Sequence, residues 1–354
     1  MPRLPQQDLD HVLGHTEALW EDLRGQSIFL TGGTGFVGTW LLESLLWAQD
    51  RRELGVTVVV LTRDPARFRG HAPHLAGHAS VRVLGGDVVS FDFPEGRFPF
   101  VIHAATAQSF EPSAECPLGT FDADVTGTRR VLEFSRRHGA RRFLFTSSGA
   151  VYGVQPSEIT HVPEDYSGAP STANATSAYG QAKRASEFIS AMYGRVYGFD
   201  AAIARLFAFV GPLLPLNANY AVGNFIRDAL TGGPVRIAGD GTPSRSYLYA
   251  ADLAIWLWTI LLRGRSAYPY NVGSQDDLTI EDLARTVIRV VAPGTGIEIA
   301  RKPVPGVPRL RYVPHTRRAE EELGLRSLIP VEEGVRRTSQ WHRSGKRERT
   351  EVPG

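Results

Sequence analysis

Two kinds of hydrophobic pattern alternate along the first part of the chain. Short continuous apolar runs occupy 27–30, 56–61, 81–87, 100–105 and 142–148, as is typical of strands buried on both faces. The segments 122–138 and 179–193 instead carry apolar residues three and four positions apart, as amphipathic helices do. Buried strands that alternate with helices predict a parallel sheet covered on both sides. We therefore expect an α/β fold with a Rossmann-like, doubly wound parallel sheet.

The pattern becomes less regular after residue 206. Glycine and proline interrupt it repeatedly, and helices are predicted at 222–231, 250–263, 279–291 and 316–323. We expect a Rossmann domain over 26–206 and a smaller, partly discontinuous α/β C-terminal substrate lobe over 207–342, some segments of which return to the first domain. Apolar positions over 8–24 predict a helical extension within residues 1–25. Residues 343–354 are charged and lack periodicity, so a mobile tail is expected there.

The bulk composition narrows the classes of partner. The chain has 354 residues, and its 39 Lys and Arg against 37 Asp and Glu leave a net charge of +2, which does not favour nucleic-acid or membrane-surface binding. The single cysteine, Cys116, permits no internal disulfide and fits a reducing compartment. The longest apolar run, 253–262, is about half a membrane span, and the N-terminus lacks a secretory signal core. We expect a cytoplasmic protein with no membrane partner and no metal site.

A glycine-rich motif, TGGTGFVG, stands between the first predicted strand and the helix that follows it. Gly32, Gly35 and Gly38 allow a tight turn and let backbone N–H groups approach a pyrophosphate at the helix N-terminus. Phe36 and Val37 begin that helix and are expected at the same phosphates. The strand-loop-helix context predicts a site for NAD or NADP.

The end of the second predicted strand bears on the choice between the two dinucleotides. NAD sites usually carry an acid there, whereas this strand ends in Thr62 and Arg63. Arg63 suits the 2′-phosphate of NADP and so slightly favours NADP, with a surface arginine as the alternative because Asp64 is adjacent. Asp87, followed by Val88 after the third strand, suits an adenine contact or a simple turn.

A candidate catalytic pair lies on the predicted helix 179–193. Tyr179 and Lys183 are four residues apart and therefore face the same side of that helix. Tyrosine, with an ordinary pKa of about 10, is a poor base at neutral pH, and a neighbouring ammonium group is expected to lower that pKa. Lysine also suits the ribose of a nicotinamide cofactor, which would couple the base to the cofactor.

These motifs together resemble a known enzyme family. In chain order they are TGGTGFVG, VIHAA, DVTGT, TSSGAVYG, YGQAK, RLFAFVGP, GDGTPSRSYLYAADLA, NVGS and LGLRSLIPVEEGVRRT. The series runs from Ser27 to Trp341 and is similar to the extended short-chain dehydrogenase/reductase superfamily, in its NAD(P)-dependent nucleotide-sugar epimerase/dehydratase branch.

The resemblance implies roles for individual residues. Ser148 would hydrogen-bond the reacting oxygen, Tyr179 would exchange its proton and Lys183 would tune Tyr179. The stretch His103, Ala104 and Ala105 would lie along the cofactor. The resemblance also expects one further arginine to contact the diphosphate, and the candidates for it are Arg301, Arg309 and Arg311. The residues expected to contact the nucleotide-diphosphate sugar are Thr106, Ser148, Gly149, Ala150, Asn224, Arg245 and Arg311.

The sequence also departs from the family pattern. Ala208 replaces an asparagine expected to contact substrate, Asp124 stands where asparagine is usual, and His315 stands where aspartate is usual. These changes affect how the sugar nucleotide is expected to bind. They do not affect the residues expected to take part in hydride transfer. The helices 122–138 and 179–193 are where the family usually dimerises, so the resemblance implies a homodimer.

The residues after Ser148 bear on the reaction. In the resemblance, 4,6-dehydratases carry an acidic pair there, decarboxylases a glutamate at the position of Ala150 and 3,5-epimerases a cysteine. Gly149 and Ala150 cannot titrate, and their small size is expected to leave room for a keto sugar to turn. We therefore predict a nucleotide-sugar epimerase acting on a carbinol carbon, most simply C4.

An NADPH-dependent nucleotide-4-keto-sugar reductase is the main alternative, since Arg63 suits it equally well. A 4,6-dehydratase or decarboxylase is disfavoured by Gly149 and Ala150. A non-enzymatic NADP-sensing regulator is disfavoured most, because the Tyr179 and Lys183 pair is intact.

Overall fold

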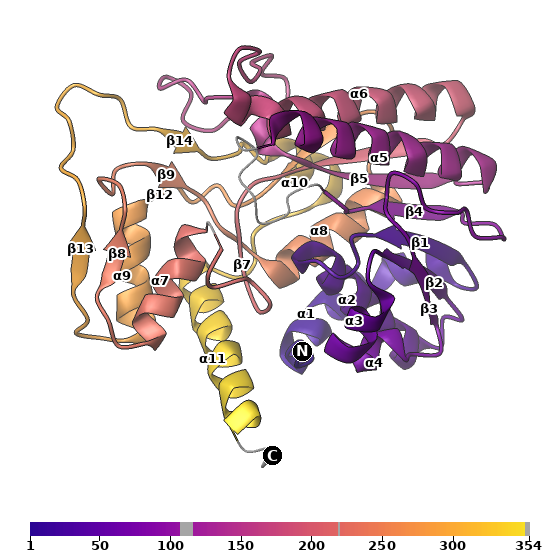
Figure 1. Ribbon diagram of the computed structural model, residues 1–354, viewed down its shortest axis with the longest axis horizontal. Helices are drawn as coiled ribbons and strands as arrows, with labels where there is room; N and C mark the ends of the chain where they lie inside the picture. Colours follow the sequence, from indigo (N-terminus) through magenta and orange to yellow (C-terminus); the bar gives the residue numbers. More distant parts are fainter. Residues whose placement is uncertain (107–115, 219, 351–354) are drawn as a thin grey trace.

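A seven-stranded parallel sheet forms the main body of the protein (Figure 1). The computed structural model describes residues 1–106, 116–218 and 220–350. The strand order is β11-β6-β5-β4-β1-β2-β3, and it reverses between β1 and β4, where such folds bind ligands at the carboxyl ends of the strands. The predicted doubly wound fold is confirmed. The strands are β1 (Ser27–Thr31), β2 (Thr57–Thr62), β3 (Val81–Gly85), β4 (Phe100–His103), β5 (Arg142–Ser148), β6 (Asp200–Leu206) and β11 (Pro269–Val272).

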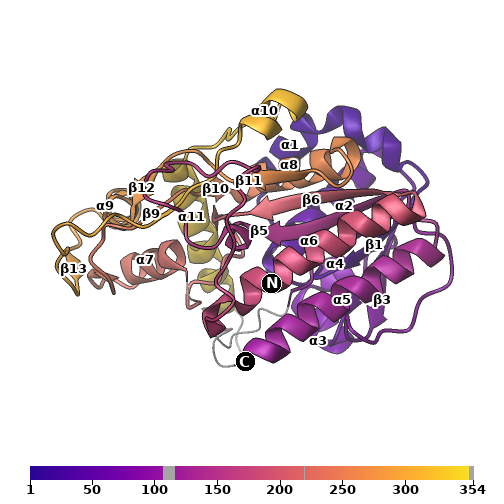
Figure 2. The ribbon, with the colours of Figure 1, turned by 90° about the horizontal axis from the view of Figure 1, so that it is seen from above.

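Both faces of this sheet are buried because alternate strand residues point to opposite sides. Ile28 and Leu30 join one hydrophobic cluster, while Phe29 between them joins the other. Figure 2 shows the two helical layers that cover these faces. One layer consists of α5 (Pro117–Arg137) and α6 (Ala178–Tyr197). The other contains α1 (Gln6–His15), α2 (Phe36–Arg52) and α8 (Ala250–Arg263), with α3 (Pro65–His71) and α4 (Pro73–Ala76) beside β2 and β3.

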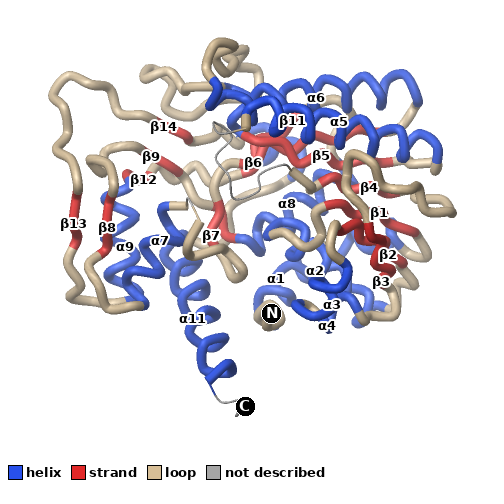
Figure 3. The backbone as a smooth tube through the Cα atoms, in the orientation of Figure 1, coloured by secondary structure: helices blue, strands red, loops and turns tan. Residues whose placement is uncertain are grey.

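The second half of the chain builds a smaller lobe of short strands and long loops beside the sheet (Figure 3). Its helices include α7 (Ala221–Leu230), α9 (Ile280–Val291) and α10 (Arg317–Leu323), close to the predicted ranges. No helix in the described ranges is both long and apolar enough to cross a membrane. The short strands pair as β7 (Phe209–Val210) with β10 (Leu248–Tyr249), as β8 (Val235–Ile237) with β13 (Ile297–Ile299), and as β9 (Ser244–Arg245) with β12 (Leu278–Thr279) and β14 (Arg311–Tyr312).

The last helix extends into the segment where a mobile tail was expected. Helix α11 runs over Val331–Thr350, so the backbone of 343–350 is helical. The charged sequence there has no apolar stripe, and its backbone continues the helix that begins at Val331. Residues 351–354 of the expected tail lie outside the described residues.

The N-terminal extension belongs to the hydrophobic core. Helix α1 ends at Thr16, and a 3-10 segment, Glu17–Leu23, follows it. Leu9, Val12 and Trp20 from these two segments are buried among α2 and α8. The Trp20 ring meets Trp258 of α8 edge to face, with 5.3 Å between ring centroids. Aromatic pairs in this geometry contribute beyond the area they bury.

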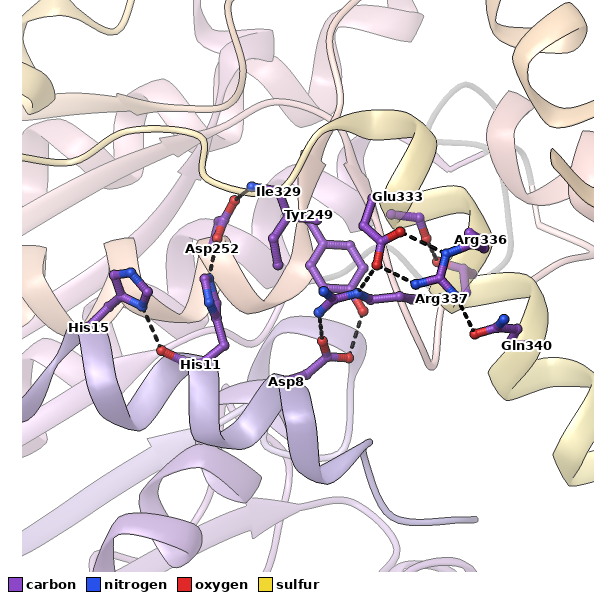
Figure 4. Close-up of polar contacts among 12 residues, drawn as sticks. Asp8, His11, His15, Tyr249, Asp252, Ile329, Glu333, Arg336, Arg337 and Gln340 are labelled. Atoms are coloured by element: carbon purple, nitrogen blue, oxygen red, sulfur yellow. Dashed lines mark hydrogen bonds and ion pairs between the residues drawn. The ribbon is translucent and has the colours of Figure 1, made fainter. Parts of the chain in front are cut away.

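A buried polar network ties the two ends of the chain to the middle (Figure 4). The Asp8 carboxylate of α1 accepts hydrogen bonds from the Tyr249 hydroxyl at 2.6 Å and from the Arg337 guanidinium at 2.6 Å. The Asp252 carboxylate accepts from the backbone N–H of Ile329 at 2.9 Å and lies 2.9 Å from His11 Nε2. Asp8 and Asp252 are fully buried, so these partners offset the cost of removing two charges from water.

Replacement of Trp20 tests how far the extension stabilises the fold. We expect Trp20→Ala to lower the free energy of unfolding by about 3 to 5 kcal/mol, because it leaves a cavity against Trp258. Urea denaturation followed by circular dichroism measures the change. Tyr197→Ala is the control, since Tyr197 is 50% exposed at the end of α6, in the helical layer on the other face of the sheet. An equal loss in both variants would contradict a core role for the extension.

Candidate active site

The glycine-rich loop joins β1 to α2 at the carboxyl edge of the sheet. Gly32 has φ +72°, and a Cβ there would lie 2.4 Å from the carbonyl carbon of Ala104. A Cβ at Gly38 would lie 2.1 Å from the carbonyl oxygen of Gly32. Both contacts are to backbone, which cannot move away. Glycine at these two positions is therefore what allows the loop to fold back against β4 and the start of α2.

The loop fits the pyrophosphate of a dinucleotide. Gly35 is the N-cap of α2, so the backbone N–H groups of Phe36, Val37 and Gly38 belong to a helix end that has no intrahelical partners. No acidic side chain stands in the first turn of this helix, whose positive end favours an anion. The residues present can thus hold the group that the sequence predicts at Gly32, Gly35 and Gly38.

Three further predicted cofactor positions lie at the same edge, at the ends of β2 and β3. Arg63 is exposed, and the neighbouring Asp64 carboxylate accepts from the backbone N–H of Arg67 at 2.8 Å as the N-cap of α3. Asp87 accepts from the Val89 backbone N–H at 3.0 Å. Val88 packs on Gly127 of α5, where a Cβ would approach its methyl group to 2.9 Å. Asp64 is thus engaged as a helix cap, whereas Arg63 is exposed to solvent.

His103, the last residue of β4, supports the loop from below. Its Nδ1 lies 2.7 Å from the Thr31 hydroxyl and its Nε2 lies 3.1 Å from the Thr128 hydroxyl. Thr128 already donates to the Asp124 carbonyl at 2.7 Å, so it accepts from Nε2–H. Nδ1 then accepts from Thr31, whose oxygen is free to accept from the Ala105 backbone N–H at 3.2 Å. The histidine is therefore neutral and fixes the end of β4.

Burial accounts for the charge state of His103. The side chain is almost completely removed from solvent, which lowers its pKa to about 3, and the nearby positive charge of Lys183 acts in the same direction. A neutral imidazole with both nitrogens engaged is not available as an acid. His103 is a positioning residue for Ala104 and Ala105, the segment that touches the glycine loop.

Ser148, Tyr179 and Lys183 meet where β5 ends beside α6. The Ser148 hydroxyl accepts from the backbone N–H of Ala150 at 3.1 Å, which fixes its oxygen at the end of the strand. Lys183 is buried, and its Nζ donates to the Thr146 carbonyl at 3.3 Å and lies 5.6 Å from the centre of the Tyr179 ring. The structure therefore brings together the three residues that the sequence predicts as catalytic.

The electrostatics differ from the expected lowering of the tyrosine pKa. Burial raises the pKa of Tyr179, and the carboxylate of Asp124 adds to that rise, while its hydrogen bond with Ser148 acts in the opposite direction. Burial lowers the pKa of Lys183, opposed by the negative charges of Asp124 and Glu187. Loss of hydration thus outweighs the ammonium effect, and the resting tyrosine is a neutral proton donor.

The space above Gly149 is filled from the second half of the chain. A Cβ at Gly149 would lie 2.7 Å from the Phe207 ring and 2.7 Å from the Tyr312 hydroxyl. That hydroxyl is 3.5 Å from Ser148 Oγ, and the Phe207 and Tyr312 rings pack with 4.7 Å between centroids. The expectation that Gly149 leaves open room beside Ser148 is therefore wrong, because two aromatic side chains occupy that room.

Strand pairing brings Arg245 to the same place. Arg245 of β9 is in register with Tyr312 of β14, and its guanidinium lies 5.4 Å from the Tyr312 ring. Burial raises the pKa of Tyr312, so its phenol stays neutral beside this arginine. Sequence reasoning missed Tyr312. The available signal was its position next to Arg311 in a strand, where neighbouring side chains face opposite sides.

Two of the three candidate arginines for the diphosphate, Arg309 and Arg311, pair with the same carboxylate. Asp277 pairs with Arg309 at 2.9 Å and with Arg311 at 3.3 Å, and Arg311 also donates to the Ser157 carbonyl at 3.2 Å. Arg301 is exposed. Of the other predicted substrate contacts, Asn224 of α7 accepts from Arg227 at 3.1 Å. The Thr106 hydroxyl donates to the Asp124 carboxylate at 3.2 Å, next to Lys183.

A phosphate-binding loop that faces a Ser, Tyr and Lys group places the protein among the dinucleotide-dependent enzymes of Rossmann fold. Residues 28–273 match the model of the NAD dependent epimerase/dehydratase family, and the chain belongs to that family. It is an enzyme of this family, as the resemblance implies.

The curated relatives include UDP-glucuronic acid decarboxylases. UDP-glucuronic acid decarboxylase 1 of Danio rerio is 30% identical over 314 residues, which is 89% of this chain and 72% of the relative. UDP-glucuronic acid decarboxylase 6 of Arabidopsis thaliana is 30% identical over 311 residues, or 87% of this chain and 86% of the relative.

Solved structures share the fold. UDP-glucose 4-epimerase of Thermotoga maritima, with UDP-glucose, has a TM-score of 0.75 at 23% identity, covering 91% of this chain and all of the other (100%). The dTDP-glucose 4,6-dehydratase of Streptomyces venezuelae, with NAD bound, has a TM-score of 0.77 at 23% identity, covering 91% and 98%. One fold therefore carries several reactions, and the reaction must be argued from the site.

A methyl group in the loop tests the cofactor site. We expect Gly38→Ala to weaken NAD and NADP binding at least about a hundredfold, because its Cβ would push the Gly32 carbonyl out of the turn. Isothermal titration calorimetry with each dinucleotide measures the loss. Gly70→Ala in α3, where a Cβ meets nothing within 4 Å, should leave both affinities unchanged. Undiminished binding by Gly38→Ala would show that the loop is not the site.

The buried neutral histidine predicts a dependence of stability on pH. His103 has a folded-state pKa of about 3 and an unfolded value of about 6.5, so the unfolded chain binds more protons between these values. Its contribution is complete above pH 6.5 and is lost as the pH falls towards 3. We expect wild type to lose up to about 1.4 kcal/mol more per pH unit in this window than His103→Asn.

Urea denaturation between pH 6.5 and 4.5 measures how the free energy of unfolding changes with pH in each protein. The two proteins have every other titrating group in common, so the difference between the two slopes belongs to His103. His103→Gln, which also removes the imidazole, should show the same reduced slope as His103→Asn. Parallel slopes for wild type and His103→Asn would mean that His103 is not held neutral.

Proposed function

We propose that the protein is an NAD(P)-dependent nucleotide-sugar epimerase that inverts a carbinol carbon, C4 in the simplest case. The observation that carries this proposal is the pairing of complete proton-transfer machinery with two residues that cannot titrate. Ser148, Tyr179 and Lys183 lie together, while Gly149 and Ala150 occupy the positions where related dehydratases and decarboxylases carry acids. Inversion requires no further acid or base, because the same oxygen loses and regains one proton.

The residues divide the work as follows. Ser148 hydrogen-bonds the sugar oxygen, and Tyr179 Oη takes the proton of that oxygen and later returns it. Lys183 supplies positive charge next to Tyr179 while the tyrosine is deprotonated. The dinucleotide, held by Gly32, Gly35, Gly38 and the segment Ala104–Ala105, supplies the hydride acceptor and donor. Arg245 is suited to the diphosphate, since its guanidinium binds phosphate oxygens in pairs.

The relatives named for decarboxylation supply a competing reading. They support a uronic acid substrate, and Arg245 next to the neutral Tyr312 hydroxyl would tolerate a carboxylate. In the family resemblance, however, that reaction uses a glutamate where this chain has Ala150. We therefore rank decarboxylation below epimerisation.

A 4-ketoreductase that uses NADPH is the second candidate. The exposed Arg63 at the end of β2, beside an Asp64 already engaged as a helix cap, favours a 2′-phosphate. A reductase would exchange its cofactor in every cycle, whereas an epimerase would retain it.

A homodimer through α5 and α6 forms part of the proposal. Phe188 and Val196 of α6 and Leu118 of α5 are large apolar side chains exposed to solvent in the single chain. Apolar exposure on two neighbouring helices supports a contact with a second copy.

A substrate panel tests the reaction. We expect one or more UDP-, dTDP-, GDP-, CDP- or ADP-sugars to be converted to an isomer of equal mass, without added reductant. The panel includes UDP-glucose and UDP-glucuronic acid, and nuclear magnetic resonance identifies the products. Tyr179→Phe should lower the rate at least about a hundredfold, since it removes the proton carrier. Tyr193→Phe, on the same helix, is the control and should keep full activity.

Other products would point to other reactions. Loss of carbon dioxide from UDP-glucuronic acid would establish decarboxylation, and loss of water would establish dehydration. Stoichiometric consumption of NADPH with a 4-keto sugar would establish the reductase. Full conversion by Tyr179→Phe would remove the basis for all of these readings.

A further inference from the structure

Asp124 of α5 is a buried carboxylate next to the catalytic lysine. Its Oδ2 lies 4.0 Å from Lys183 Nζ, and the two residues are 5% and 2% exposed. The family pattern has asparagine at this position, so the charge is a property of this chain. The proposed reaction uses no group of Asp124. The carboxylate and the Lys183 ammonium are nevertheless two opposite charges held together away from water.

The surrounding contacts hold the carboxylate in place. The Thr106 hydroxyl donates to its two oxygens at 3.2 and 3.3 Å. The Thr128 hydroxyl donates to the Asp124 backbone carbonyl at 2.7 Å, which fixes the turn of α5 on which the side chain stands. Asparagine would preserve the shape of the side chain and an oxygen that accepts from Thr106. The difference between the two residues at this site is therefore one negative charge.

Within the part of the chain that the structure describes, the other groups that face the Tyr179 and Lys183 pair carry little net charge. Glu187 of α6 is paired through both oxygens with Arg205 of β6, at 2.7 and 2.9 Å. His103 of β4 is neutral, and β5 presents the Thr146 carbonyl. Tyr312 of β14 is a neutral hydroxyl with Arg245 of β9 beyond it, and the hydroxyl of Tyr220 precedes α7. Among the described residues, the Asp124 carboxylate is the one that forms an ion pair with Lys183.

We propose that Asp124 is a positioning residue for protons: its charge keeps the Tyr179 and Lys183 pair protonated up to a higher pH, so that the resting pair is in the form that protonates a keto oxygen. The inference rests on the proposed function, because it concerns the same proton transfer. It assigns to this chain a site biased towards protonation of a keto oxygen, the reductive half of the reaction.

Charge counting gives the direction of the effect. Neutral Tyr179, protonated Lys183 and ionised Asp124 sum to zero, and loss of one proton leaves a net charge of −1. With asparagine the same loss changes the sum from +1 to zero. A site that becomes neutral when it loses a proton releases that proton more easily than a site that becomes negative. Burial makes this difference in energy larger, because little solvent screens the charges. The result holds whichever of the two groups loses the proton.

The individual groups respond in the same sense. The negative charge of Asp124 raises the pKa of Tyr179 in addition to burial, and it raises the pKa of Lys183 against the lowering by burial. Removal of the carboxylate therefore lowers both values. A role confined to packing would change neither.

Titration of the tyrosine tests this without any substrate. Tyrosinate absorbance is followed against pH in wild type and in Asp124→Asn, each with the matching Tyr179→Phe protein subtracted. We expect the apparent pKa of the pair to be about one to two units lower in Asp124→Asn. An unchanged or higher value would overturn the proposal. Asp124→Ser, which also removes the charge, must shift the titration in the same direction and serves where the asparagine variant does not fold.

The pH profile of catalysis is the second readout. In Asp124→Asn the rate of sugar oxidation, measured in a single turnover with loaded enzyme, should reach half its maximum about one to two pH units lower. A uniform loss at every pH would indicate a packing role and contradict the proposal. If no nucleotide sugar reacts with wild type, the proposed function fails, while the tyrosine titration still decides the role of Asp124.

Asp8→Asn is the matched control. Asp8 is also a buried carboxylate between a cation and a tyrosine, Arg337 and Tyr249, but it lies in the network of Figure 4 that joins the chain ends. This variant should lower the melting temperature and leave both the tyrosine titration and the pH profile at their wild-type positions. A shift as large as that of Asp124→Asn would show that the effect is not specific to the catalytic pair.

Discussion

The structure of the site depends on one backbone contact at the centre of the sheet. Strands β1 and β4 are in register at Thr31 and His103, and immediately beyond them Gly32 lies against Ala104 with no space for a side chain. This contact occurs where the strand order reverses, so it places the glycine-rich loop at the point where folds of this kind bind ligands. His103, held neutral between two threonine hydroxyls, keeps the end of β4 in place. The positions of the cofactor loop and of the catalytic group are thus fixed relative to each other.

The second lobe completes the catalytic pocket. Ser148 ends a strand of the main sheet, whereas Tyr312 and Arg245 arrive on two short paired strands from far along the chain. A side chain at position 149 would not fit, because the Phe207 ring and the Tyr312 hydroxyl occupy the volume that it would need. A residue that carries no chemistry therefore allows a hydroxyl from another segment to reach the serine. The pocket is closed on that side by aromatic packing.

Local periodicity and short spacing were sufficient for the fold class, for strands β1 to β5, for the glycine loop and for the Tyr179 and Lys183 pair, whereas strands β6 and β11 were not predicted and Ser148 came from the family resemblance. Tyr312 could not be predicted, since its approach to Ser148 depends on the pairing of β9 with β14, two strands of two residues each. Arg311 was expected at the diphosphate from the family resemblance, with Arg301 and Arg309 as alternatives, and its pairing with Asp277 accounts for its actual contacts. The pKa of Tyr179 was expected to fall because of Lys183, and only the three-dimensional burial shows that desolvation outweighs that charge. The helix over 343–350 continues α11 without an apolar signal of its own.

The contact between Asp8 and Arg337 has a consequence for the order in which the protein forms during synthesis. The two residues are 329 positions apart, so the N-terminal helix emerges from the ribosome long before its ionic partner exists. Until then burial of the carboxylate against α2 and α8 would leave it with the Tyr249 hydroxyl but without its ionic partner, which makes that burial costly. Docking of the first helix is therefore coupled to arrival of the last one.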